Sequence, residues 1–94
     1  MGKVAYKVKG GKMIKVNLTL NEGRIEEIKI TGDFFLHPEE TIEDIERTLR
    51  GCILNEERIG SLIRDALSRK GAILLGATPE DLARCIIMAG EKNG

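Results

Sequence analysis

A change in hydrophobic periodicity at residues 28–35 constrains this chain more than any other feature of its sequence. Before it, apolar and polar residues alternate with the period of two that is typical of half-buried strands. After it, apolar residues recur every three to four positions, as in amphipathic helices. The stretch contains Gly32 and Asp33, a pair typical of sharp turns, because glycine tolerates positive φ and a short carboxylate accepts backbone N–H groups. The sequence therefore predicts an α+β fold in which strands precede helices.

The turn is followed by the only two phenylalanines in the sequence, Phe34 and Phe35. Aromatic side chains usually mark a core, so one interpretation is a buried corner between sheet and helices. The other interpretation is functional, with Asp33 as an exposed polar contact beside an aromatic patch. On this second interpretation, Asp33 and Phe35 are candidate partner-interface residues.

The region before the turn predicts a three-stranded antiparallel β-meander. Apolar residues alternate with lysines over residues 3–9, and apolar and polar residues alternate again over residues 14–20. Between these two strands, Gly10-Gly11 fits the positive-φ positions of a tight hairpin. The first two strands are therefore expected to pair directly.

The third strand is predicted over residues 24–31, after a loop of three to five residues with Gly23 in the left-handed position. Its apolar phase slips by one residue between Ile25 and Ile28. A β-bulge at Glu26-Glu27 would absorb this slip and keep both isoleucines on the core face.

The rest of the chain predicts three helices packed on one face of this sheet. The first helix has an apolar stripe formed by Ile42, Ile45 and Leu49. Thr41 followed by Asp44 resembles a capping box at its start, and a positive-φ glycine is expected to end it.

The second helix is predicted to begin after the N-cap residue Asn55 and to end near Lys70. The third begins at Thr78-Pro79, where an N-cap precedes proline at the first helical position, and runs to about Ala89. Residues 72–75 form an apolar connector whose conformation the sequence does not specify.

Length and charge narrow the class of protein. The 94 residues predict a single domain spanning 1–94. Fifteen basic residues balance fifteen acidic ones and there are three aromatic residues, which gives no argument for a nucleic-acid partner. No apolar run approaches the ~20 residues that cross a bilayer, so a cytoplasmic protein without a membrane partner is expected.

The sequence shows no catalytic or metal-binding constellation. Cys52 and Cys85 are isolated from each other, and His37 has no nucleophile-like neighbour. We therefore assign no catalytic, cofactor-binding or metal-binding residue. Both cysteines are expected to be buried and reduced, because free cysteine is among the most buried residue types.

The third helix has an apolar arc wider than one core requires. If Leu82 and Cys85 face the sheet, Ile87 lies at the edge of the arc and Met88 beyond it. Such an apolar patch on a small protein often marks a partner site, so Ile87 and Met88 are also candidate partner-interface residues. The alternative is that the connector at 72–75 covers this side.

Several segments resemble one known family. Residues 21–25 leading into 30–35, then 45–52, and finally 80–90 are similar to the C-terminal accessory domain of lipoate–protein ligases. The resemblance extends over essentially the whole chain. This chain has neither the arginine and glycine-rich loop nor the catalytic lysine of the ligase catalytic domain. The resemblance therefore implies the accessory domain made as a separate subunit.

This resemblance implies a non-catalytic accessory subunit of a two-part lipoate–protein ligase. Such a ligase uses ATP to activate lipoate as lipoyl-AMP and then transfers the lipoyl group to a lysine of an acceptor domain. The implied partner is the catalytic subunit, in a heterodimer, with lipoyl acceptor domains as indirect partners. ATP, Mg²⁺ and lipoate would serve the complex, and none is expected to bind this chain alone.

Two alternatives stay open at this stage. The predicted arrangement also resembles iron–sulfur scaffold and sulfur-carrier proteins, in which Cys52 would carry sulfur. That role needs an exposed, activated thiolate. The other alternative is a structural adaptor unrelated to lipoate.

Overall fold

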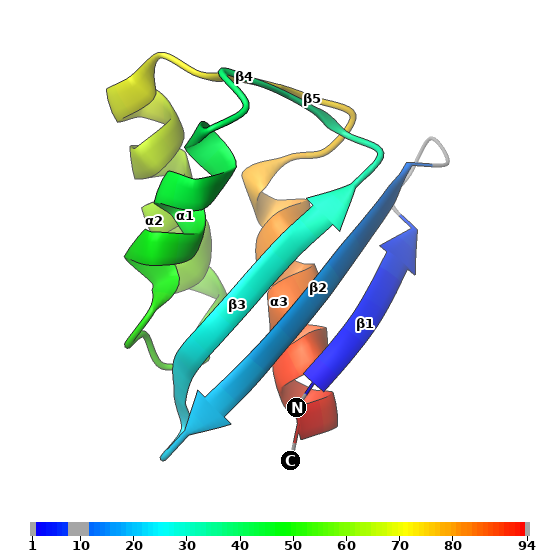
Figure 1. The fold of residues 1–94 in the computed structure, drawn as a ribbon, viewed down its shortest axis with the longest axis vertical. Coiled ribbons are helices and arrows are strands. Elements are labelled where there is room, and N and C mark those ends of the chain that lie inside the picture. Colours follow the sequence, from blue (N-terminus) through cyan, green and yellow to red (C-terminus); the bar gives the residue numbers. More distant parts are fainter. Residues whose placement is uncertain (1, 8–11, 94) are drawn as a thin grey trace.

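The computed structural model describes residues 2–7 and 12–93, and its main sheet has three strands (Figure 1). They are β1 (Gly2–Lys7), β2 (Met13–Asn21) and β3 (Arg24–Gly32), antiparallel in the order β1-β2-β3. The predicted three-stranded meander is confirmed. The predicted turn at Gly10-Gly11 lies outside the described residues.

The pairing of β2 with β3 contains the predicted bulge. Thr19 pairs with Glu27, whereas the next residue, Leu20, pairs with Ile25, so Glu26 is the extra residue. The loop between these strands is shorter than predicted, because Asn21 pairs with Arg24 and only two residues connect them. These two residues, Glu22 and Gly23, have positive φ values of 53° and 78°, as in the two-residue turns whose twist matches that of the paired strands.

A second, two-stranded sheet was not predicted. It consists of β4 (Phe35–His37) and β5 (Ile73–Leu75), which pair antiparallel. Figure 1 shows this ribbon at one end of the molecule, beyond the end of β3. The connector at 72–75 therefore becomes a strand, and its partner follows directly from the turn after β3.

Three helices complete the fold: α1 (Thr41–Leu49), α2 (Glu56–Lys70) and α3 (Pro79–Asn93). Helix α3 packs against β1 and β2, α1 packs against β3, and α2 contacts both α1 and α3. The α+β class is thus confirmed. Within the described residues, no helix is both long and apolar enough to cross a membrane.

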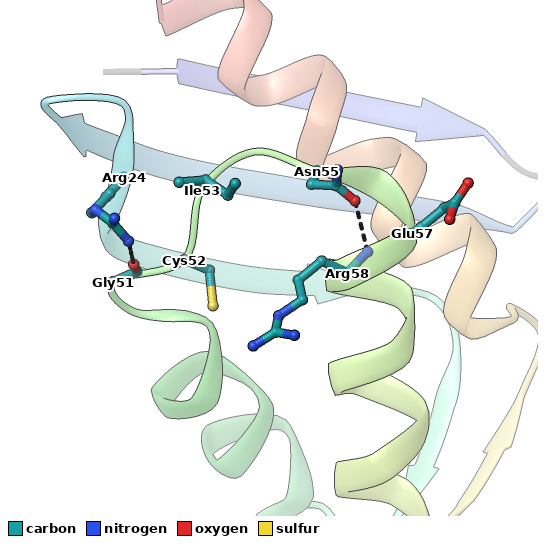
Figure 2. A pocket seen from close by; sticks show the side chains of 7 residues that line it. All are labelled: Arg24, Gly51, Cys52, Ile53, Asn55, Glu57 and Arg58. Atoms are coloured by element: carbon teal, nitrogen blue, oxygen red, sulfur yellow. Dashed lines mark hydrogen bonds between the residues drawn. The ribbon is translucent and has the colours of Figure 1, made fainter.

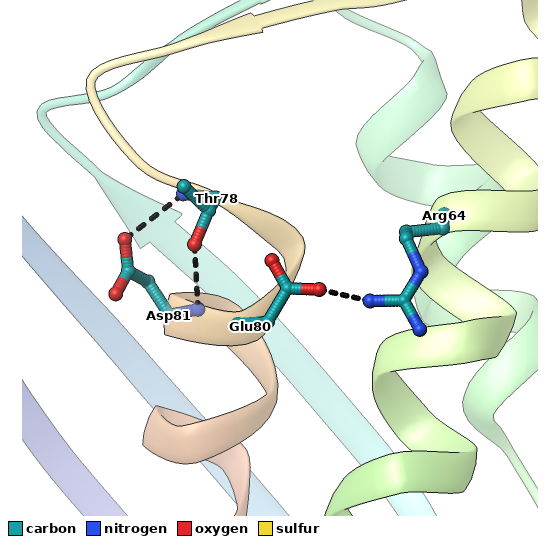
Figure 3. A network of polar contacts seen from close by, with 4 residues as sticks. All are labelled: Arg64, Thr78, Glu80 and Asp81. Atoms are coloured by element: carbon teal, nitrogen blue, oxygen red, sulfur yellow. Dashed lines mark hydrogen bonds and ion pairs between the residues drawn. The ribbon is translucent and has the colours of Figure 1, made fainter.

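The helix starts agree with the sequence at two of three positions. The Asn55 side chain accepts a hydrogen bond from the Arg58 backbone N–H at 2.9 Å. At the start of α3, Thr78 Oγ1 accepts from the Asp81 N–H at 3.1 Å while the Asp81 carboxylate accepts from the Thr78 N–H at 3.0 Å (Figure 3). This reciprocal pair is a capping box with aspartate in place of glutamate.

The capping box predicted at Thr41 is wrong. Thr41 is the first helical residue of α1, one position too late for an N-cap, and Glu40 occupies the N-cap position without a side-chain bond. The preceding turn supplies the acceptors instead, since the N–H of Thr41 donates to the Pro38 carbonyl at 3.1 Å. The Thr41 hydroxyl is buried with no hydrogen-bond partner among the described residues.

One hydrophobic core unites the main sheet with all three helices. Alternate residues of β2 and β3 enter it, as the period-two pattern predicts, together with one stripe from each helix. Its buried members are Ile14, Val16, Leu18, Ile25, Ile28, Ile30, Ile45, Leu49, Ile59, Ile63, Ala66, Leu82, Ala83, Cys85, Ile86 and Ala89.

The outer edge of β3 is covered by α1 and the loop after it. The buried Glu46 carboxylate accepts the Ile30 N–H at 2.8 Å. Further along, the Ile25 N–H donates to the Cys52 carbonyl at 2.9 Å, and the Gly51 N–H donates to the Ile25 carbonyl at 2.7 Å. This edge is therefore blocked against pairing with another strand.

Candidate partner surface

The outward side of the β4–β5 ribbon is the most apolar exposed surface of the described chain. Cross-strand pairing places Phe35 opposite Leu75 and His37 opposite Ile73, so these four side chains share one side. We call them the β4–β5 face. The Phe35 and His37 rings are stacked, with centroids 6.3 Å apart and planes 8° from parallel. The residues between them in sequence, Leu36 and Leu74, point inward.

Exposure singles this face out. Phe35 is 55% exposed, Ile73 54% and Leu75 58%. Within residues 2–7 and 12–93, only one other large hydrophobic side chain is exposed, Ile53 at 52%. The solvent-facing side of a surface ribbon is usually polar. Here, in contrast, three of the four exposed large hydrophobic side chains of the described residues lie together on this one face.

A groove lies next to this face, with a volume of about 290 Å³. Phe35 belongs to both the groove and the face. The other lining residues come from the end of β3, the turn, the rest of β4 and the start of α1: Ile30, Thr31, Gly32, Phe34, Leu36, Glu39 and Ile42. The groove extends the apolar surface beyond the ribbon itself.

Glycine is required at position 32, in the turn before the ribbon, for a different reason than predicted. Gly32 does not have positive φ. Instead, a Cβ on Gly32 would overlap the Met13 carbonyl oxygen and lie 2.9 Å from the Phe34 ring. The Asp33 N–H donates to that same carbonyl at 2.8 Å. Close approach of backbones, not left-handed geometry, thus requires glycine here.

The four candidate interface residues occupy two separate places. Asp33 and Phe35 are both exposed at the ribbon, and Phe34, not Phe35, is the phenylalanine that packs against the core. Ile87 and Met88 are only half-buried on α3, and Ile87 packs against the core. Figure 1 shows the C-terminal half of α3 at the opposite end of the molecule from β4 and β5. The sequence analysis did not identify Ile73 and Leu75 as members of this exposed apolar face.

A larger cavity, of about 690 Å³, lies between the start of β3 and the loop that joins α1 to α2 (Figure 2). Three of its polar side chains take part in hydrogen bonds with nearby backbone groups. Arg24 donates to the Gly51 carbonyl at 2.9 Å, and the Asn55 side chain is used in capping α2. The Cys52 thiol, which lines the cavity, donates to the Thr48 carbonyl at 3.6 Å. No nucleophile–base pair is formed by these residues.

The two cysteines differ in burial. Cys85 is fully buried, and burial raises the pKa of its thiol to about 11. Cys52 is half-buried at the cavity wall, so the prediction that both are buried is wrong for Cys52. The cause is that Cys52 belongs to the loop that pairs with the edge of β3, which turns its side chain toward the cavity (Figure 2).

Charged residues between α2 and α3 form surface ion pairs and no metal site. Arg64 pairs with Glu80 across the two helices (Figure 3), and Arg84 pairs with Glu56 at 3.9 Å. Within the described part of the chain, no three His, Cys, Asp or Glu side chains gather into a group that could hold a metal ion. Both pairs link α2 to α3 at the surface.

Comparison with known proteins gives consistent matches. A family model described as bacterial lipoate protein ligase C-terminus matches residues 4–86. Lipoate-protein ligase A subunit 2 of Thermoplasma acidophilum is 41% identical over 81 residues, which are 86% of this chain and 82% of that protein.

One structural neighbour comes from an archaeal lipoylation system: a bi-partite lipoate protein ligase and its E2 lipoyl domain, from Thermoplasma acidophilum. The TM-score is 0.75 at 38% identity, covering 89% of this chain and 91% of that one. The sulfur-carrier alternative is not favoured by these matches.

Proposed function

Because the chain belongs to the family of the bacterial lipoate protein ligase C-terminus, we propose that it is the non-catalytic accessory subunit of a two-part lipoate–protein ligase. Its role is in the ATP-dependent activation of lipoate to lipoyl-AMP, which precedes transfer of the lipoyl group to a lysine of an acceptor domain. Its partner is the catalytic subunit, with which it forms a heterodimer.

One observation carries this proposal: the similarity covers more than four-fifths of both chains, for a relative named as subunit 2 and for a neighbour from a bi-partite ligase. The matched unit is therefore the whole α+β domain rather than one motif within it. A fold shared over its full extent supports a shared role as one part of a two-part enzyme.

The activation step explains what such a subunit contributes. The lipoate carboxylate attacks the α-phosphate of ATP, which forms a carboxyl–phosphate bond and releases pyrophosphate. In the second step the lysine amine takes the lipoyl group and AMP leaves. The mixed anhydride between these steps is prone to hydrolysis. A subunit that closes over the site excludes water and holds the reactants in a productive geometry, without supplying a reacting group.

ATP, Mg²⁺ and lipoate then act in the complex, and we assign their binding to the catalytic subunit. Since the reaction consumes ATP, we place the complex in the cytoplasm.

We also infer that all three helices lie on one face of the main sheet, since they share one core with alternate residues of β2 and β3. The other side of these strands, with Lys15, Asn17 and Lys29, is exposed.

The test is reconstitution. Isolated catalytic subunit is incubated with lipoate and ATP, with or without this chain, and pyrophosphate release is measured. We expect no release from this chain alone and an increase of at least about tenfold when it is added to the catalytic subunit, because closure improves positioning. Equal rates with and without this chain contradict the proposal.

A further inference from the structure

We propose that the β4–β5 face is the surface through which this chain docks on the catalytic subunit. This inference rests on the function proposed above and adds the location of the interface. It assigns Phe35, Ile73 and Leu75 as apolar anchors, with the stacked His37 beside them.

The first argument is clustering. The face holds three of the four large hydrophobic side chains that are exposed within residues 2–7 and 12–93. Their positions result from strand pairing, which brings residues 35 and 75 together from distant parts of the sequence. Burial of apolar surface is favourable, so three large apolar side chains exposed together on one face are typical of a surface that a partner covers.

The second argument is that the face is pre-organised. Leu36 is buried and Leu74 packs against the core, so the ribbon is anchored from its inward side. At its ends, a Cβ on Gly76 would lie 3.4 Å from both Phe34 Cα and Lys12 Cγ, which shows how closely the flanking segments approach. An anchored surface loses little conformational entropy on binding.

The third argument is the surroundings of the face. Interfaces combine an apolar centre with a polar rim. Exposed polar residues, Asp33 and Lys12, lie in the segments that flank the ribbon, and Glu39 lines the adjoining groove. This arrangement of an apolar centre, a groove and mixed charges fits a protein partner.

The two-part assembly of the structural neighbour indicates the occupant, and the exposed area indicates how far the contact extends. Three half-exposed large side chains offer roughly 300 Å², well below the ~800 Å² per partner of a stable interface. The face is therefore the centre of a wider contact that includes the groove and rim. The structural neighbour comes from a bi-partite lipoate protein ligase. Since the function proposed above places this chain in such an assembly, we assign the face to the catalytic subunit rather than to a second copy of this chain.

The test compares two serine variants by titration calorimetry against the isolated catalytic subunit. The first combines Phe35→Ser with Leu75→Ser, and the matched control is Ile53→Ser, a side chain of similar exposure at the other end of α1. We expect the double variant to raise Kd at least about 100-fold and the control to change it by less than about twofold. Circular dichroism and thermal melting verify that both remain folded.

If the double variant unfolds, Ile73→Ser alone tests the same face, with an expected rise in Kd of about tenfold. A wild-type chain that binds and stimulates the catalytic subunit, together with face variants of unchanged Kd, overturns the docking surface and leaves the proposed function intact. A wild-type chain that neither binds nor stimulates overturns the proposed function. Sedimentation that shows a wild-type dimer dissociated by the double variant assigns the face to a second copy and also overturns the inference.

Discussion

Cys52 and Cys85 have the same functional group in different surroundings. The Cys85 thiol is enclosed by the core and donates to the Ile14 carbonyl at 3.7 Å. Burial disfavours its thiolate, which raises its pKa to about 11. Cys52 lies at the wall of an open cavity. Because the thiolate is the form that reacts with alkylating reagents, the two residues should differ in reactivity.

We predict that a maleimide reagent at about pH 8 modifies Cys52 at least ~10 times faster than Cys85 in the native protein. Mass spectrometry of peptides from timed samples measures both rates. In denaturant the two rates should converge, which serves as the control. Equal rates in the native state would show that the core opens around Cys85 or that Cys52 is enclosed.

Glu46 and Gly32 show why some residue roles cannot be predicted from sequence. Glu46 lies on a helix that the sequence identifies correctly, but its buried carboxylate binds the Ile30 N–H, which belongs to a strand distant in the sequence. The sequence predicts that a turn requires glycine at position 32, but the structural cause is the Met13 carbonyl oxygen, which leaves no space for a Cβ. Both roles depend on which segments pair, and local periodicity contains no information about that.

Among the elements, those with a long repeating pattern were predicted and the short ones were not. The strands β2 and β3 and the three helices have enough alternating or helical positions to define a period. Strands β4 and β5 have three residues each, too few for a period. Apart from His37, the side chains of these strands are apolar on both sides, so Phe35 could equally be assigned to the core. The candidate surface was therefore only half identified, through Asp33 and Phe35.

Helix α3 contacts the loop between α1 and α2 at a glycine, which leads to a test of packing. A Cβ on Gly90 would overlap the Leu54 side chain, lying 3.2 Å from its Cγ and 2.9 Å from its Cδ2. We predict that Gly90→Ala destabilises the fold by about 1–3 kcal/mol, measured by urea denaturation. Helix propensity alone predicts the opposite sign, a gain of about 1 kcal/mol.

The control for this prediction is the same substitution in a Leu54→Ala background. With the leucine side chain removed, the new methyl group has space, and Gly90→Ala should stabilise the fold relative to Leu54→Ala alone. A loss of the same size in both backgrounds would show that the glycine is required for some reason other than contact with Leu54.

At the scale of the whole molecule, the chain has two regions: a main domain built around one core and the small β4–β5 ribbon. The main sheet and the helices share that core, and the chain as a whole is compact, with a radius of gyration of 12.0 Å. The ribbon of β4 and β5 lies at one end of the molecule (Figure 1). Three of its large apolar side chains are exposed. A compact domain with an exposed apolar face at one end fits the proposed subunit, which would act by binding and closing over a partner's active site.

The most direct measurement of this role separates the two steps of the ligase reaction. Catalytic subunit is supplied either with lipoate and ATP or with pre-formed lipoyl-AMP, each with and without this chain, and lipoylation of an acceptor domain is followed by mass spectrometry. We predict that the chain is required when lipoate and ATP are supplied and has little effect when lipoyl-AMP is supplied. Equal rates of lipoylation from lipoate and ATP, with and without the chain, would contradict its role as the accessory subunit for activation.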